Sequence, residues 1–170
     1  MNPLWNRFEQ LDSRLTGWMA RYGVLLLRLS LGVVYLWFGA LKFIPGASPA
    51  EELALRTIEV FSLGLLSGAA ALPLLAAWEV LIGLGLIIGR GMRFTLLLLA
   101  LQMVGTVSPL FIFPQETFAV FPWVPTLAGQ YIIKNLVIAS AALVIGATVR
   151  GGKLISEPQP VVLSRAASGD

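Results

Sequence analysis

The chain has 170 residues, of which 57% are hydrophobic and 12% are charged, and its formal net charge is +3. Soluble domains usually carry about 25% charged residues, so this composition predicts a membrane protein of one domain. The sequence contains neither Cys nor His. The absence of Cys excludes a disulfide and a thiol redox centre. Without Cys and His the chain also lacks the usual ligands of zinc, haem and iron–sulfur clusters, so we expect no metal site and no covalent cofactor. The basic residues flank apolar segments, which indicates a rim facing anionic lipid and argues against nucleic-acid binding.

The first segment, residues 1–22, has the pattern of an amphipathic helix. Apolar side chains recur at intervals of three or four residues: Leu4, Phe8, Leu11, Leu15, Trp18 and Tyr22. Most charged side chains lie away from this stripe, which predicts a helix lying in the membrane interface. An ordinary solvated N-terminus is the alternative.

Four apolar runs follow, each close to the roughly 20 residues that a helix needs to cross a bilayer. They cover residues 24–44, 69–89, 94–113 and 130–149. We therefore expect an all-α fold, a polytopic membrane four-helix bundle over residues 23–150 with the N-terminal interfacial helix before it. Residues 151–170 have little periodicity and predict a flexible tail. Residues 51–61 predict a short amphipathic helix outside the membrane, and residues 114–129 predict a loop.

Basic residues gather in the segments that would share one side of the membrane: Arg7, Arg14, Arg21, Arg90, Arg93, Arg150 and Lys153. The other two loops contain a single basic residue, Arg56. Because basic loops stay in the cytoplasm, we expect a multi-pass membrane protein with both termini cytoplasmic.

One face of the first span is polar and lined by small residues. It carries Arg28, Leu31, Tyr35, Phe38 and Lys42, and it is bordered by Gly32 and Gly39. Charged groups find no partner in lipid, so we expect this face to point into the bundle and Leu36 to lie outside it. Snorkelling to the two interfaces is the alternative for the charged side chains.

Glu79 lies about two turns inside the second span, where its short side chain must pair, be protonated or face water. We predict a pair with at least one of Lys42 and Lys134, because both lysines fall at a similar depth in the outer half of the membrane and the three charges would form a cluster. A pair that merely fixes helix register is one interpretation. The functional interpretation is a pocket with surplus positive charge, which would bind a small anion or the polar head of a quinone. Further candidate pocket residues are Arg28, Tyr35, Trp78, Gln102, Gln130 and Asn135.

Two stretches resemble the DoxX family of small four-span bacterial membrane proteins. They are Gly39-Ala40-Leu41-Lys42-Phe43, preceded by Arg28 and Gly32, and the fourth-span stretch from Gly129 to Leu136. The resemblance covers about residues 22–153, and the aromatic outer loops are similar to those of the reactive-chlorine resistance subgroup. The resemblance implies a four-helix bundle in the bacterial inner (plasma) membrane, with polar residues clustered inside.

The family resemblance also implies a function. One branch of the family is the small subunit of a thiosulfate:quinone oxidoreductase, and others accompany enzymes of oxidative stress. We therefore expect a non-catalytic or quinone-binding membrane subunit of a redox system, which depends on a redox partner protein and is compatible with a homo-oligomer. A scaffold with a purely structural charge cluster and a small-molecule transporter are the alternatives.

Overall fold

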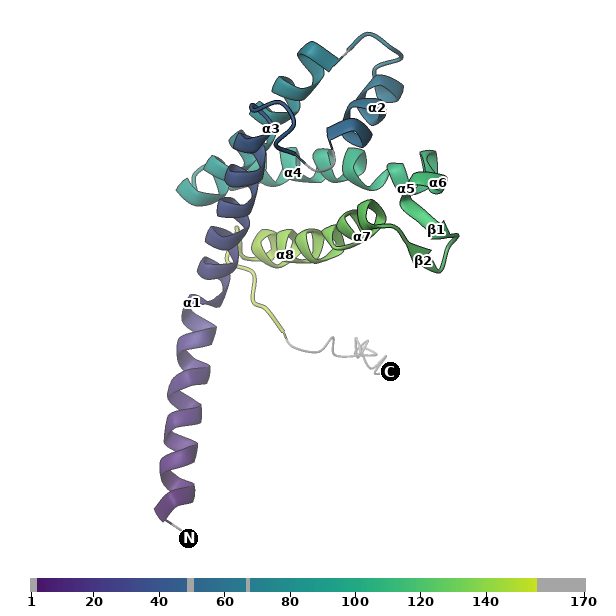
Figure 1. Ribbon diagram of the computed structural model, residues 1–170. Helices are drawn as coiled ribbons and strands as arrows, with labels where there is room; N and C mark the ends of the chain where they lie inside the picture. Colours follow the sequence, from purple (N-terminus) through teal and green to yellow (C-terminus); the bar gives the residue numbers. More distant parts are fainter. Residues whose placement is uncertain (1–2, 49–50, 67, 156–170) are drawn as a thin grey trace, which may run out of the picture.

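The computed structural model describes residues 3–48, 51–66 and 68–155. Most residues of the predicted C-terminal tail, 156–170, lie outside the described residues. Four helical segments are long and apolar enough to cross a membrane: Arg7–Leu41, Ala70–Ile88, Met92–Ile112 and Leu127–Thr148. The predicted all-α fold with four spans is confirmed, and the spanning helices pack together as a bundle (Figure 1).

Helix α1 (Pro3–Leu41) is continuous over 39 residues, so no break separates the first 22 residues from the first span. No proline interrupts the chain between Pro3 and Pro45, and the long apolar and basic side chains between them favour helix. At a rise of 1.5 Å per residue α1 is about 58 Å long, roughly twice the thickness of a hydrocarbon core. Its N-terminal half projects from the bundle as a single helix (Figure 1). The predicted amphipathic helix is thus an extension of the first span.

Helix α3 (Gly68–Ile88) packs along the C-terminal half of α1, and glycines let the two backbones approach closely. A Cβ atom at Gly32 would lie 2.8 Å from the Ile87 side chain, and one at Gly83 would lie 2.9 Å from the Cα atom of Leu36. Any larger residue at these two positions would push the helices apart.

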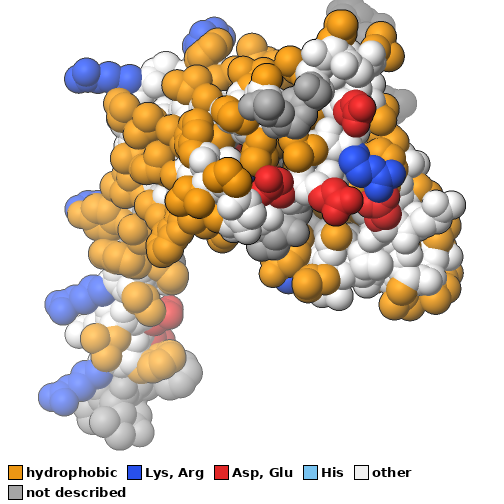
Figure 2. Space-filling view, turned by 45° about the horizontal axis from the view of Figure 1, so that its top comes forward, with side chains coloured by type: hydrophobic (Ala, Val, Ile, Leu, Met, Phe, Trp, Pro, Cys, Tyr) orange, Lys and Arg blue, Asp and Glu red, His pale blue; other side chains and the backbone are white. Residues whose placement is uncertain are grey.

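The core of the bundle lies where α1 and α3 meet α4 (Met92–Val107) and α8 (Asn135–Thr148). Its most buried side chains are Leu31, Tyr35, Ile82, Leu86, Leu99 and Ile145. Tyr35 is only 5% exposed, which confirms the predicted rotation of the first span, although Phe38 is 55% exposed and lies off the buried face. On the face shown in Figure 2, apolar side chains cover much of the surface of the bundle.

The segments that connect the spans at one end of the bundle are largely ordered. Helix α2 (Glu51–Phe61) confirms the predicted short amphipathic helix. Residues 114–129, predicted as a loop, contain regular elements: α6 (Pro114–Thr117), β1 (Phe118–Val120) and β2 (Val124–Pro125), which pairs with β1 in an antiparallel hairpin. Helix α5 (Pro109–Ile112) extends the third span, and the fourth begins earlier than predicted, with α7 (Leu127–Ile133).

Candidate functional site

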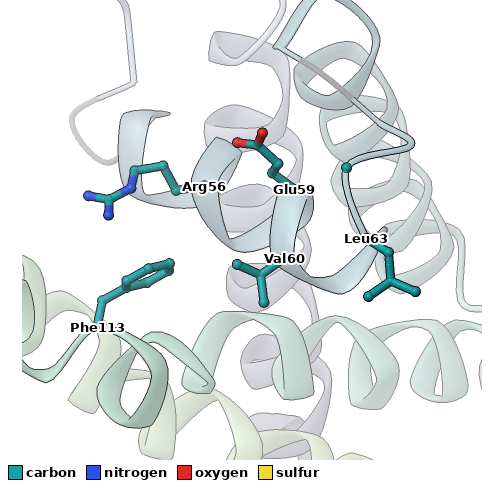
Figure 3. Close-up of a pocket in the computed structure, with 6 residues that line it drawn as sticks. Arg56, Glu59, Val60, Leu63 and Phe113 are labelled. Atoms are coloured by element: carbon teal, nitrogen blue, oxygen red, sulfur yellow. The ribbon is translucent and has the colours of Figure 1, made fainter.

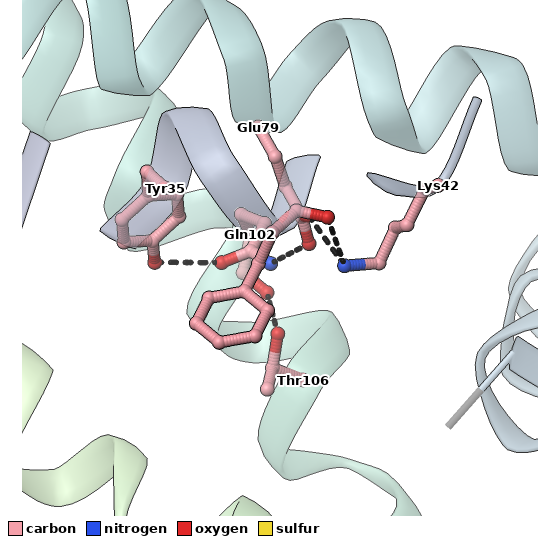
Figure 4. A network of polar contacts seen from close by, with 6 residues as sticks. Tyr35, Lys42, Glu79, Gln102 and Thr106 are labelled. Carbon is pink, nitrogen blue, oxygen red and sulfur yellow. Dashed lines mark hydrogen bonds and ion pairs between the residues drawn. The ribbon is translucent and has the colours of Figure 1, made fainter. Parts of the chain in front are cut away.

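A network of polar side chains joins three helices near the end of α1 (Figure 4). The ammonium of Lys42 donates to Oε2 of Glu79 at 2.6 Å. The side-chain amide of Gln102 donates to the other carboxylate oxygen, Oε1, at 3.1 Å. The hydroxyl of Tyr35 donates to the amide oxygen of Gln102 at 3.0 Å. The four side chains form a continuous chain of hydrogen bonds.

Helical periodicity places these residues. Tyr35 and Lys42 are seven residues apart, about two turns, so their side chains leave α1 from the same face. Glu79 lies in the middle of α3, and Gln102 lies in α4, opposite that face. The hydroxyl of Thr106 donates to the backbone oxygen of Gln102 at 3.0 Å, within α4. Each of three spanning helices therefore contributes at least one member.

The network is almost fully enclosed and electrically balanced. Glu79 is 7% exposed, and both of its oxygens accept hydrogen bonds. Among the described residues, no buried side-chain nitrogen or oxygen lacks a partner. A buried carboxylate and a single ammonium together form a neutral pair. The hydrogen bonds to the carboxylate offset much of the free-energy cost of removing the carboxylate from water. The predicted pair between Glu79 and a lysine is confirmed, and that lysine is Lys42.

The structure does not bring Lys134 to this network. Lys134 is exposed at the junction of α7 and α8, with its ammonium 5.3 Å from the ring centre of Tyr131. The ion pairs of the described residues join Lys42 to Glu79 and Arg56 to Glu116. The expected second cation at Glu79 is therefore wrong. Burying another ammonium beside a carboxylate that is already neutralised would cost desolvation with no compensating partner.

The remaining candidates are also separate from the network. Gln130 is exposed, and the amide of Asn135 donates to the backbone oxygen of Tyr131 at 3.1 Å. Trp78 donates from its indole to the backbone oxygen of Leu98 at 3.1 Å, which ties α3 to α4 beside Glu79.

Arg28 lies near the opposite end of the membrane-spanning part of α1. It is two heptads from Lys42, about 21 Å along the helix. Its guanidinium packs against the backbone at Gly89, where a Cβ atom would lie 2.8 Å from Cζ of Arg28. Arg28 therefore belongs to the basic end of the bundle and is no part of the Glu79 network.

A second polar cluster was missed in the sequence. Arg56 of α2 forms an ion pair with Glu116 of α6, and its guanidinium carbon lies 4.7 Å from the ring centre of Phe113 (Figure 3). Arg56 borders an open depression of about 450 Å³ together with Glu59, Val60, Leu63, Gly64 and Phe113. The sequence could have indicated this pair, because Arg56 is the only basic residue of the two outer loops and Glu116 is the only acidic residue of the second outer loop. The pair is largely exposed, so it fastens α2 weakly.

The described residues contain no group of three or more acidic side chains that could hold a metal ion. The DoxX family model matches residues 23–115. This range holds every member of the Glu79 network and also Arg56. It leaves outside the N-terminal half of α1, the fourth span and Glu116, the partner of Arg56. No curated protein and no solved structure matches the chain.

Proposed function

Because this chain belongs to the DoxX family and is a multi-pass membrane protein, we propose that it is the membrane subunit of a redox system and binds the polar head of a quinone at Lys42. The family match alone defines a fold and no reaction. The proposal is supported by the hydrogen-bonding capacity of one side chain in the network.

Lys42 has donors to spare. An ammonium carries three N–H donors, of which one is used by Glu79 at 2.6 Å. The backbone oxygen of Phe38 is a long second acceptor at 3.5 Å. The Lys42 side chain is 15% exposed, whereas Glu79 is 7% exposed and Tyr35 is 5% exposed. Lys42 can therefore donate to an incoming carbonyl oxygen without giving up its pair with Glu79.

The surroundings of Lys42 suit an apolar ring that enters from the lipid. Phe38 is 55% exposed and precedes Lys42 by four residues, about one turn, so the two side chains leave the helix on the same side. A quinone combines a flat apolar ring with carbonyl oxygens, so it matches a partly exposed donor beside an exposed aromatic side chain. A small anion matches less well, because the pair of Lys42 and Glu79 is neutral overall and Lys134 lies elsewhere.

The electrons would come from a redox partner protein. The chain has no Cys and no His, so its own side chains offer no thiol or haem centre. We place the protein in the bacterial inner membrane with both termini in the cytoplasm, because of the distribution of basic residues. The loops at the outer end carry a single base, Arg56, whereas basic residues gather in the N-terminal segment, at Arg90 and Arg93, and after the fourth span.

A structural role of the network is the second candidate, and one observation favours it: every buried side-chain nitrogen and oxygen of the described residues already has a hydrogen-bond partner. A saturated network needs no ligand to be stable. The protein would then act as a scaffold that assembles other proteins, and its charges would only fix the three helices in register.

A binding measurement separates these functions. The full-length protein in nanodiscs is titrated with a short-chain ubiquinone analogue, and quenching of Trp fluorescence reports binding. Lys42→Met combined with Glu79→Gln removes both charges without stranding either, and Lys134→Met is the matched control. We expect at least tenfold weaker binding in the double variant, since a hydrogen bond from a charged donor contributes about 1.5–3 kcal/mol, and unchanged binding in the control.

Three results would contradict the quinone proposal. If the wild type does not bind the analogue while partner capture survives the double substitution, the scaffold function is correct. If solute flux in proteoliposomes depends on Glu79 without any quinone binding, the transporter alternative is correct. If both variants bind as the wild type does, the quinone site lies elsewhere.

A further inference from the structure

Four arginines follow one side of α1 at a constant interval of seven residues: Arg7, Arg14, Arg21 and Arg28. Seven residues make almost two full turns, so successive members are rotated by only about 20° and stand about 10.5 Å apart. We call these four residues the arginine file. Figure 2 shows basic side chains along one edge of the projecting half of α1. The file runs from the projecting half into the first span.

The arginine file has no ion pair within the described structure. The two ion pairs of the described residues use Lys42 and Arg56 as their bases. Acidic residues do occur on this half of α1, but Glu9 and Asp12 lie about 160° and 140° around the helix from Arg7, on the other side. Among the described residues, the file therefore presents positive charge that no acidic side chain neutralises through an ion pair.

The file continues onto the turn between α3 and α4. Arg28 packs against Gly89, and the next residue along the chain is Arg90, followed by Arg93 in the first turn of α4. Both of these arginines are exposed. The basic surface thus spans α1 and the neighbouring end of the bundle, which is the level at which the apolar spans end.

An exposed apolar stripe lies beside the file. Leu11, Leu15, Trp18 and Tyr22 are 65%, 56%, 50% and 39% exposed. They lie about a quarter of a turn from the arginines on the helix surface. A helix with bulky apolar side chains on one face and arginines along its edge is the kind that binds in the headgroup region of a bilayer.

We propose that the arginine file, with Arg90 and Arg93, binds the phosphate groups of anionic phospholipids. This binding bends the continuous helix α1 near Gly23, where nothing lies within 4 Å of an added Cβ atom, so that the N-terminal half of α1 comes to lie on the membrane surface. The exposed stripe then enters the boundary between headgroups and acyl chains. A protein partner would have to offer acidic groups every 10.5 Å beside an apolar groove, whereas an anionic leaflet offers both along its whole surface. Residues 7–22 precede the matched range, which begins at residue 23, so this lipid-binding element is an addition to the DoxX domain.

Labelling at single cysteines tests the proposal, because the native chain has none. Leu15→Cys places an environment-sensitive dye on the exposed stripe, and Ser13→Cys places it on the polar side as the matched control. The full-length protein is compared in nanodiscs of phosphatidylcholine alone and with added phosphatidylglycerol. We expect the dye at position 15 to move to an apolar environment only with phosphatidylglycerol, and the dye at position 13 to stay in water.

Removing arginines should weaken this shift of the dye at position 15 in proportion to the number of arginines removed. Arg7→Gln, Arg14→Gln and Arg21→Gln should each lower the ratio of membrane-bound to free helix about fivefold, and high salt should reverse the shift in the wild type. Lys134→Gln, at the opposite end, should change nothing. Four results would each overturn the proposal. The dye could give equal spectra in the two lipids, or the triple arginine variant could behave like the wild type. The shift could also be produced by inorganic phosphate, or it could require another protein.

Discussion

Gly39 of α1 lies directly opposite Glu79 of α3: a Cβ atom at position 39 would come within 2.8 Å of the Cβ atom of Glu79 and 3.0 Å of the backbone nitrogen of Val80. The absence of a side chain at one residue thus sets how near α1 comes to the buried carboxylate. Lys42, one turn further along α1, reaches Glu79 because of this approach.

Gly39→Ala should therefore separate α1 from α3 and weaken the ion pair. Overpacking of this kind typically costs about 1–3 kcal/mol, which thermal unfolding in detergent would register as a lower melting temperature. Gly105→Ala in α4 is the control, since nothing lies within 4 Å of the added methyl group. An alanine at position 39 that melts like the wild type would show that the contact is looser than the structure has it.

Glu79→Gln should destabilise the bundle by about 3–5 kcal/mol, because the ammonium of Lys42 would lose its anionic partner in an enclosed site. Adding Lys42→Met should recover part of the loss, and unfolding of the single and double variants measures the coupling. If Glu79→Gln leaves unfolding unchanged while quinone binding disappears, the carboxylate serves the ligand and contributes nothing to the structure.

Gln102→Leu should leave two groups without a partner, the hydroxyl of Tyr35 and the Oε1 atom of Glu79. Each unsatisfied buried group costs about 1–3 kcal/mol, so the loss of stability should exceed that of an ordinary hydrogen bond. Tyr35→Phe in the Gln102→Leu background removes one of these groups and should cost less than it does in the wild type. Additive losses would mean that Tyr35 and Gln102 do not interact.

The proposed orientation predicts that Trp123→Cys reacts with a membrane-impermeant thiol reagent added from outside the cell, and that Arg93→Cys reacts only from the cytoplasmic side. Trp123 is 83% exposed and Arg93 is exposed, so neither reaction is limited by burial. Labelling of Trp123→Cys from the cytoplasmic side alone would reverse the proposed orientation.

The spans and the charged pair were predictable because lipid imposes strong rules on sequence. Apolar length alone fixes four helices. Once Glu79 had to be paired inside the membrane, the lysines at a similar depth were its only basic partners, and one of them is the partner observed. The burial of Tyr35 followed from its position two turns from Lys42.

The rest depended on packing that periodicity does not encode. Gln102 was a candidate, but its place between Tyr35 and Glu79 follows from how α4 is rotated against α1 and α3. Lys134 failed as a partner because it sits at the junction of α7 and α8, where its side chain faces outward. The continuity of α1 could have been predicted from the sequence. A change from an amphipathic to an apolar pattern does not end a helix when no proline interrupts it.

The glycines at the contact between α1 and α3 also bear on entropy. Gly32, Gly39 and Gly83 bring main chain against main chain, and glycine has no side-chain rotamers to freeze when helices associate. The separation of α1 and α3 is consequently insensitive to side-chain motion. Such a contact holds the two backbones at a fixed separation beside the ion pair of Lys42 and Glu79.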